Sequence, residues 1–425
     1  MNKKIILKNF MEVRYLRKFN SRKKLEKYQA KKVREQLEYM REKSPYFHNL
    51  KFEKLEDLPY MDKSVMMANF NEMNTAGIDK DEALELAIKG EKERDFSDKL
   101  HGYSVGLSSG TSGHRGCFVL SDDEIATWVG GMLGKMIPRG KLLGNRVAFF
   151  LRADNNLYEA TNTKVLKFRF FDILKPMAQN ISDLQEYQPT VLVAPPSVLM
   201  QLARAIQDKE LDISPIKVIS VAEVLTDKDK KYFKRIFKQD IIYQVYQCTE
   251  GFLGYTCDCG SLHINEDVVY IEKEYIDKNR FSPVITDFIR KTQPIIRYRL
   301  NDILVEDKRP CPCGSKLLRL KRIEGRMDDV FILPGKDGKD VEVYPDFISR
   351  AMVYVPNISD YKVVQETKKR VTVYLDNPNK TTQKAVEKEL KTLANKMNFV
   401  MPALTFKRYE ADLTRKMKRV ERVFK

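Results

Sequence analysis

The chain is organised around one short stretch, Leu107-Ser-Ser-Gly-Thr-Ser-Gly-His-Arg-Gly-Cys-Phe-Val-Leu120. Its glycines permit positive φ angles and a close backbone approach, so successive N–H groups can point at one anion. Four hydroxyl side chains add further donors: Ser108, Ser109, Thr111 and Ser112. The composition indicates a loop that wraps around phosphate, with Gly110 and Gly113 at its centre. A flexible linker is the alternative for this stretch alone.

This loop differs from a Walker A loop. No Gly-Lys-Ser/Thr sequence follows the glycines and no helix obviously begins there. His114 and Arg115 place cationic or donor groups beside the loop, and the following residues 117–120 are of strand type.

Beyond this stretch, short apolar runs alternate with helical patterns, which predicts a parallel α/β sheet. The expected strands are residues 147–151, 191–194, 218–222 and 241–246. Ligands of such sheets bind at the carboxyl ends of strands. We therefore expect binding residues at Ala222, Glu223 and within residues 246–251.

The two ends of the chain have a different character. Apolar residues at helical spacing predict an amphipathic helix with a basic outer face over residues 16–41, and residues 82–93 read as a charged helix. Residues 263–276 and 283–305 resemble hairpin or barrel strands. After Arg326, a turn, helices over 345–352 and 380–396 and strands over 361–364 and 371–375 predict a separate C-terminal lobe.

Composition indicates a globular protein of about two or three domains, because 43% of the 425 residues are hydrophobic. No signal-peptide core and no apolar run of membrane-span length occurs, so we expect a cytoplasmic protein. The net charge of +17 concentrates near both ends. Such clusters could serve nucleic acid, a membrane surface or a polyanionic substrate, although a solvated basic helix face is the simpler interpretation. Six cysteines in a long chain without a secretory signal argue against a disulfide framework.

Four further stretches follow the loop in chain order. They are Tyr246-Gln-Cys-Thr-Glu250-Gly, Arg297-Tyr-Arg-Leu-Asn-Asp302, Ile323-Glu-Gly-Arg326-Met-Asp328-Asp329 and Thr414-Arg-Lys416-Met-Lys-Arg419. With these five motifs the chain resembles the adenylate-forming enzymes, and within them the phenylacetate-CoA ligase and coenzyme F390 synthetase branch. Residues 58–63 and 149–158 support that branch.

The resemblance implies a role for each motif. Residues 108–116 would cradle the β- and γ-phosphates of ATP, Thr249 would contact the α-phosphate, and Glu250 would bind Mg²⁺. Tyr246 would pack on adenine, with Ala222 and Glu223 lining the base pocket. Asp302 would accept hydrogen bonds from both ribose hydroxyls, which suits a carboxylate with two acceptor oxygens.

The hinge and the C-terminal loop complete the implied site. Asp328 would be the pivot about which the C-terminal lobe swings, and Arg326 would contact the nucleotide. The family's catalytic lysine corresponds best to Lys416, with Lys418 as the alternative, because this loop lacks the usual glycine and proline. A solvated basic tail remains a further interpretation of this segment. His114 and Arg115 replace the Lys-Pro pair that often closes the phosphate loop in the family.

Two cysteine clusters predict a metal site. Cys257-Asp-Cys259-Gly-Ser-Leu-His263 and Cys311-Pro-Cys313-Gly offer five ligands for four places, with reduced buried cysteines as the alternative. The resemblance to the branch selects Cys257, His263, Cys311 and Cys313 as ligands of a structural zinc.

The sequence therefore predicts an α/β protein built from a large N-terminal adenylation domain, residues 1–326, and a small mobile α+β lid domain, residues 327–425. The N-terminal domain would have a basic helical start over residues 1–100, layered mixed sheets with a barrel-like part, and the zinc knuckle within residues 257–313.

The resemblance implies an ATP-dependent ligase that converts a carboxylic acid, by family default an aromatic or other small acid, into an acyl-adenylate with pyrophosphate release. Transfer to CoA or a carrier would follow. The alternatives are an F390 synthetase-like nucleotidylating enzyme without a CoA step, and a polyanion-binding protein on a degenerate ligase fold. The acyl pocket would include Phe149, Arg152 and Tyr158. No specific nucleic-acid partner is expected, and a homodimer is common in the branch.

Overall fold

The computed structural model describes residues 2–93, 95–107, 116–140, 142–151, 166–358, 360–410 and 417–424. The predicted phosphate-loop residues Ser108, Ser109, Gly110, Thr111, Ser112 and Gly113 and the predicted catalytic Lys416 lie outside the described residues, as do Arg152 and Tyr158.

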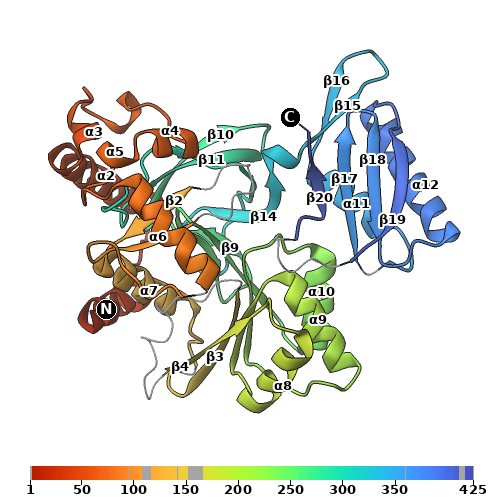
Figure 1. Ribbon diagram of the computed structural model, residues 1–425, viewed down its shortest axis with the longest axis horizontal. Helices are drawn as coiled ribbons and strands as arrows, with labels where there is room; N and C mark the ends of the chain where they lie inside the picture. Colours follow the sequence, from red (N-terminus) through yellow and green to blue (C-terminus); the bar gives the residue numbers. More distant parts are fainter. Residues whose placement is uncertain are drawn as a thin grey trace.

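The chain begins with a group of helices that lies at one side of the molecule, in red and orange (Figure 1). They are α1 (Lys3–Met11), the π-helical turn η1 (Glu12–Leu16), α2 (Arg22–Lys43), α3 (Pro45–His48), the 3₁₀ turn η2 (Leu55–Asp57), α4 (Lys63–Ala68), α5 (Phe70–Met73) and α6 (Lys80–Glu93). The expected helix over residues 16–41 is wrong at its start. Ser21 caps α2 by accepting a hydrogen bond from the Lys24 N–H, so the helix begins at Arg22.

The phosphate-loop stretch joins the two strands of an antiparallel hairpin, β1 (Ser104–Leu107) and β2 (Cys117–Leu120). Helix α7 (Asp122–Met136) follows immediately. Its start is fixed by a capping box, in which Ser121 and Glu124 each bond the other's backbone N–H.

A sheet of twelve strands forms the core of the N-terminal part. Five strands run parallel: β3 (Asn145–Leu151), β4 (Leu166–Asp172), β5 (Val191–Ala194), β6 (Lys217–Ser220) and β7 (Ile242–Cys248). Helices α8 (Met177–Tyr187), α9 (Pro196–Gln207) and α10 (Asp227–Ile236) connect them. Successive side chains of a strand point to opposite faces. Accordingly Leu192 packs in the core beneath α8, α9 and α10, whereas Val191 and Val193 pack in the core beneath α7.

The same sheet continues with antiparallel strands: β8 (Gly251–Thr256), β9 (Leu262–Ile264), β10 (Val269–Tyr275), β11 (Arg280–Asp287), β12 (Tyr298–Arg299), β13 (Asp302–Glu306) and β14 (Arg319–Arg326). The strand order from edge to edge is β10-β11-β13-β14-β9-β8-β7-β6-β5-β3-β4, and β12 pairs with β11. The strands expected to form a barrel-like part therefore extend the parallel sheet. The predicted α/β class with large multi-stranded sheets is confirmed.

The C-terminal part has its own sheet and its own core. After the short 3₁₀ turn η4 (Met327–Asp329) comes the hairpin of β15 (Phe331–Pro334) and β16 (Asp340–Val343). Strands β17 (Tyr361–Thr367), β18 (Arg370–Leu375), β19 (Ala403–Arg408) and β20 (Val420–Arg422) form a sheet in the order β19-β18-β17-β20. Helices α11 (Pro345–Val353) and α12 (Lys380–Met397) pack on it. A C-terminal lobe is thus present, as the sequence predicted.

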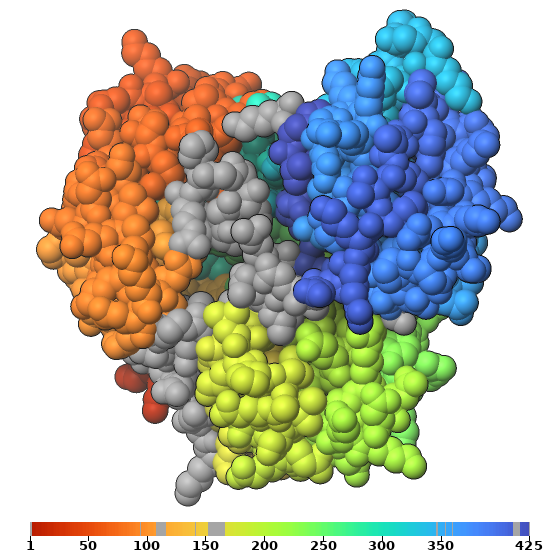
Figure 2. Space-filling model, turned by 45° about the vertical axis from the view of Figure 1, so that its right-hand side comes forward, coloured from red at the N-terminus to blue at the C-terminus, as the bar shows by residue number. Residues whose placement is uncertain are grey.

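The C-terminal lobe, in blue, lies against the yellow-green segment that carries α9 and α10 (Figure 2). Arg204 of α9 donates to Asp360 over 2.7 Å, and Lys228 of α10 donates to the Ile358 carbonyl over 2.9 Å. These contacts hold the lobe over the carboxyl ends of β6 and β7. No helix among the described residues is long and apolar enough to cross a lipid bilayer.

Candidate active site

A cavity of about 180 Å³ lies between the carboxyl ends of the parallel strands, the hinge and the C-terminal lobe. Among its walls are five residues predicted to contact the nucleotide: Ala222, Glu223, Tyr246, Asp302 and Arg326. Met417, Lys418 and Arg419 of the C-terminal lobe close it. The structure therefore brings together most of the described residues that are predicted to contact the nucleotide, and Lys418 is the described lysine of the C-terminal loop that reaches them.

Tyr246, Asp302 and Arg326 form one connected group. The buried Tyr246 hydroxyl donates to Asp302 Oδ2 over 2.7 Å, and Arg326 Nε lies 3.6 Å from Asp302 Oδ1. Burial, reinforced by the Asp302 charge, raises the pKa of Tyr246 well above its usual value, so the phenol stays protonated and remains a donor. These two contacts fix the position of the Asp302 carboxylate.

Ala222 and Glu223 form a turn at the carboxyl end of β6. Ala222 has a φ of 66°, a left-handed conformation that is unusual for alanine and that aims the backbone into the cavity wall. Glu223 accepts hydrogen bonds from both the N–H and the hydroxyl of Ser197, each over 3.0 Å, and from the Met417 N–H over 3.1 Å. Glu223 therefore links α9 to the C-terminal loop in this arrangement.

Thr249 and Glu250 directly follow β7, whose last residue Cys248 lines this cavity, but neither of the two lines it. The Thr249 carbonyl accepts a hydrogen bond from Arg290 Nη1 over 2.9 Å. The Glu250 carboxylate lies near the Tyr298 hydroxyl: burial first, and then the Glu250 charge, raise the pKa of Tyr298. The carboxylate is thus held in a partly buried, polar position beside the motif.

Lys63 is a cation near this carboxylate to which the sequence motifs assigned no role. Burial lowers its pKa, and the charge of nearby Glu250 opposes that shift, while Arg326 reinforces it. The position follows from strand pairing, because the Met61 N–H donates to the Arg297 carbonyl and Met61 pairs with Tyr298. This lysine belongs to residues 58–63, which support the resemblance to the phenylacetate-CoA ligase branch. Nothing in its local sequence indicates a contact with Glu250, which lies more than 180 residues away.

The two neighbouring aspartates of the hinge, Asp328 and Asp329, make different contacts. Asp328 accepts a hydrogen bond from Asn301 Nδ2 over 2.8 Å and is absent from the cavity wall, whereas its neighbour Asp329 lines the cavity. Asp329 pairs with Lys418 over 2.9 Å. The hinge is therefore tied on one side to the residue that precedes β13 and on the other to the C-terminal loop.

A second, apolar cavity of about 350 Å³ adjoins the first and shares with it Ala222, Val245, Gln247 and Cys248. It lies between α7 and the parallel strands. Its walls are mainly aromatic and aliphatic: Phe118, Trp128, Met132, Leu133, Met136, Ile137, Val147, Phe149, Leu151, Phe168, Val191, Val193, Ile219 and Val221. Thr249 also lines it, which places a hydroxyl of the central motif at an apolar chamber.

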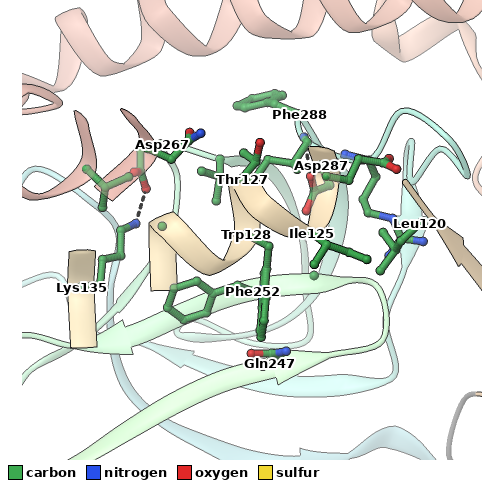
Figure 3. Close-up of a pocket in the computed structure, with 18 of the residues that line it drawn as sticks. Leu120, Ile125, Thr127, Trp128, Lys135, Gln247, Phe252, Asp267, Asp287 and Phe288 are labelled. Atoms are coloured by element: carbon green, nitrogen blue, oxygen red, sulfur yellow. Dashed lines mark hydrogen bonds and ion pairs between the residues drawn. The ribbon is translucent and has the colours of Figure 1, made fainter. Parts of the chain in front are cut away.

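A third, more polar cavity of about 280 Å³ lies on the other side of Trp128 and shares Gln247, Cys248 and Thr249 with the apolar one. Figure 3 shows Trp128 pointing from α7 toward Gln247, and Lys135 pointing toward Asp267. Lys135 donates to Asp267 over 2.6 Å and to Asn265 over 2.7 Å, so this buried cation is paired with a carboxylate and held in place by an amide oxygen.

The four predicted metal ligands converge. One ligand atom from each of Cys257, His263, Cys311 and Cys313 lies within 4.8 Å of every other. The sulfurs of Cys257 and Cys311 are 3.7 Å apart, and Cys313 Sγ is 3.6 Å from His263 Nε2. The fifth candidate, Cys259, is exposed and is not part of this group.

The geometry of this Cys/His cluster fits a tetrahedral metal. Ligands about 2.0–2.3 Å from a zinc ion would be about 3.5–3.8 Å from one another. His263 Nδ1 lies 3.2 Å from the Leu317 carbonyl, which fixes the ring and leaves Nε2 for an ion. The cluster joins the end of the β8–β9 hairpin to the loop before β14.

The sequence of the chain is similar to parts of two known proteins. No protein-family model matches the chain. Protein CapK of Staphylococcus aureus is 29% identical over 217 residues, which cover 50% of this chain and 47% of that protein. A phenylacetate-coenzyme A ligase of Thermus thermophilus is 24% identical over 200 residues, covering 43% of each chain. The matched segments thus span less than half the length of both curated relatives.

Among solved structures, 2-hydroxyisobutyryl-CoA ligase in the postadenylation state, in complex with its acyl-adenylate, superposes with a TM-score of 0.70. That match covers 94% of this chain and 90% of the ligase at 15% identity. The resemblance to the adenylate-forming enzymes is thereby confirmed: this chain has the fold of the adenylate-forming ligases, with their C-terminal domain, and is similar in sequence to a phenylacetate-coenzyme A ligase.

Proposed function

We propose that the protein is an ATP- and Mg²⁺-dependent ligase that converts a carboxylic acid into an acyl-adenylate. The observation that carries this proposal is the convergence of Ala222, Glu223, Tyr246, Asp302 and Arg326 on one cavity, directly beside an apolar chamber. A nucleotide and a hydrophobic acid could lie next to each other there, with Thr249 near their junction.

The reaction requires the negative charge around the α-phosphorus of ATP to be stabilised. A carboxylate oxygen of the acid forms a bond to the α-phosphorus, the bond from that phosphorus to the oxygen shared with the β-phosphate breaks, and pyrophosphate leaves. Negative charge grows on oxygens that already repel each other, so aligned cations and donors accelerate the step. Arg326, Lys63 and the loop that contains Lys416 and Lys418 would supply those cations, and Thr249 a hydroxyl donor.

The remaining groups would bind and orient the nucleotide. Tyr246 and Arg326 hold the Asp302 carboxylate, whose oxygens would accept hydrogen bonds from the ribose hydroxyls. Glu223 and Ala222 would border the base. Glu250 would hold the Mg²⁺ ion, which when bound neutralises phosphate charge. Residues 108–113 would contact the outer phosphates.

The apolar cavity suggests the class of acid. Trp128, Phe149 and Phe168 line it, and none of the described residues that line it is charged. A cavity with aromatic walls favours an aromatic or other compact apolar acid over a long or highly charged one. Thioester formation with CoA would follow, in keeping with the partial similarity to the phenylacetate-coenzyme A ligase of Thermus thermophilus.

Two structural features complete the proposal. The Cys/His cluster would hold a structural zinc ion, since its donor set and spacings match a closed tetrahedral site. The domain boundary would lie after Arg326, where β14 ends and the hinge begins, so that residues 327–425 act as the lid.

The test is a panel of carboxylic acids assayed for pyrophosphate release, with and without CoA. We expect one or a few aromatic or compact apolar acids to release pyrophosphate, and CoA to increase turnover by accepting the acyl group. If no acid of the panel causes pyrophosphate release, although the protein is shown to bind ATP, the result would favour a non-catalytic binder. Release that requires a hydroxyl compound in place of an acid would favour a nucleotidylating enzyme.

A further inference from the structure

An apolar ridge runs along the outer side of the N-terminal segment. Leu7, Met11 and Tyr15 follow one another four residues apart on α1 and η1, and Leu16 is next to Tyr15. Their side chains are 62%, 44%, 44% and 73% exposed, respectively. Single exposed apolar residues are ordinary, but four within one 14-residue segment require an explanation.

The inner side of α1 is already packed, so the ridge is not a core face left uncovered by chance. Helix α1 lies beside α7 at the edge of the molecule (Figure 1). The helices approach so closely at Gly130 that a Cβ there would lie 2.4 Å from the Ile6 carbonyl and 2.8 Å from Asn9 Cβ. The residues that pack on α7 thus lie opposite Leu7 and Met11.

Arg14 fixes the end of the ridge. This buried guanidinium donates to the carbonyls of Gly134, Ile137 and Pro138 over 3.0 to 3.3 Å, where α7 ends. It also lies against the rings of Phe10 and Tyr15, 5.6 and 5.9 Å from their centroids. The exposed side chains are therefore presented by an anchored segment.

Lysines flank the ridge. On a helix with 100° between residues, Lys3 falls on one side of Leu7 and Met11, and Lys4 and Lys8 on the other. These lysines, and Lys18 after the π-helical turn, are exposed. The segment thus combines an apolar ridge with a cationic border, in a protein of net charge +17.

We propose that this ridge docks the protein on an anionic lipid surface, with Leu7, Met11, Tyr15 and Leu16 entering the headgroup region and the lysines contacting lipid phosphates. Interfacial helices combine these same two features. A second copy of the chain fits less well, because the flanking lysines and the net charge would repel it. Four side chains also fall short of the roughly 800 Å² per partner that a stable dimer buries. This inference stands independently of the proposed enzyme activity.

The test is co-sedimentation of the full chain with vesicles of phosphatidylcholine, with or without phosphatidylglycerol. We expect binding to the anionic vesicles, weakened by salt, and little binding to pure phosphatidylcholine. Leu7→Ser/Leu16→Ser should weaken binding by about tenfold or more, because two exposed leucines no longer leave water. The neutral substitutions leave the electrostatic attraction unchanged.

The matched control is Tyr354→Ser/Val400→Ser, which removes two exposed apolar side chains of the C-terminal lobe and should bind as the wild type does. Circular dichroism would establish that all variants fold. Equal binding by the wild type and Leu7→Ser/Leu16→Ser would overturn the proposal, as would an absence of binding to anionic vesicles. Loss of binding in Lys3→Ala/Lys4→Ala/Lys8→Ala, with the fold retained, would support it further.

Discussion

Tyr246 illustrates how a residue's role changes once its partner is known. The sequence motif predicts an aromatic platform for adenine, and the structure adds a buried hydrogen bond from its hydroxyl to Asp302. The two residues are separated by 56 positions, so no local pattern could reveal the pairing. The hydroxyl, and not only the ring, therefore contributes to the candidate nucleotide site.

Tyr246→Phe should raise the KM for ATP about tenfold with a smaller effect on kcat, because a hydrogen bond to a charged acceptor is lost while the ring remains. Steady-state pyrophosphate release at varied ATP measures this split. Tyr243→Phe, in the same strand but outside the cavity wall, is the control. A variant with unchanged KM would show that the Asp302 carboxylate needs no help from Tyr246.

Asp287 provides a residue-scale prediction about stability. Burial raises its pKa from 3.8 to about 6, although the Ile289 and Arg290 N–H groups and the Arg290 charge oppose the shift. Between these two values the folded state binds more protons than the unfolded state, so this group lowers stability as pH rises through that window. The penalty is fully present above the folded pKa and absent below the unfolded one.

Asp287→Asn should therefore stabilise the protein above pH 6, by on the order of 2 kcal/mol, and the gain should vanish toward pH 4. Urea unfolding across this pH range measures it. Asp337→Asn, at an exposed turn, should change little at any pH. A gain that does not depend on pH would contradict the titration of Asp287 as its cause.

At the scale of elements, the predictions that succeeded rest on local pattern. The buried strand β5 is a continuous apolar run because α7 covers one face and α8, α9 and α10 the other. The predicted start of α2 was wrong because Ser21 caps the helix, which therefore begins at Arg22, although the apolar periodicity continues toward the N-terminus. The position of Lys63 and the link from Glu223 to Met417 could not be predicted, since both depend on chain segments that meet only in the folded protein.

The Cys/His cluster predicts a difference between two nearby cysteines. Cys313→Ser should reduce bound zinc below one ion per chain and lower the Tm by about 5 °C or more, because the ion would link the β8–β9 hairpin to the loop before β14. Cys259→Ser should keep both the zinc content and the Tm, since Cys259 lies outside the cluster. Metal analysis and thermal unfolding measure the two quantities. Equal zinc content in both variants would refute the ligand assignment.

A group of ion pairs around Asp360 connects the C-terminal lobe to α9 and α10. Asp360 accepts hydrogen bonds from Arg204 of α9 over 2.7 Å and from Arg419 of the C-terminal loop over 3.3 Å, and Arg419 also pairs with Asp229 of α10. Breaking this group should loosen the arrangement that brings Lys418 to the nucleotide cavity.

Asp360→Asn should slow adenylate formation about three- to tenfold, because removing one member of a partly buried charge group leaves its arginines poorly compensated. A single-turnover measurement of acyl-adenylate formation is suitable, since it isolates the first chemical step. Asp208→Asn, an exposed residue at the end of α9, is the matched control. An unchanged rate would mean that these ion pairs do not support the pose needed for adenylation.

At the scale of the whole molecule, the arrangement of the two lobes makes the site. The parallel strands supply Ala222, Glu223 and Tyr246, the antiparallel extension supplies Asp302 and Arg326, and the C-terminal lobe closes the cavity with Lys418. The resemblance carried by five ordered motifs anticipated this fold, which the comparison with 2-hydroxyisobutyryl-CoA ligase bears out. The roles of the individual residues stay predictions.

The most direct test of the account is acid-dependent exchange of labelled pyrophosphate into ATP, which reports formation of an acyl-adenylate without any thiol acceptor. We predict exchange in the wild type that requires both an acid and Mg²⁺, and a loss of about a hundredfold or more in Glu250→Gln, which keeps the shape but removes the charge that would hold the metal. Glu387→Gln, at an exposed position of α12 that is absent from the cavity wall, should retain exchange. Undiminished exchange in Glu250→Gln, or exchange that needs no acid, would contradict the account.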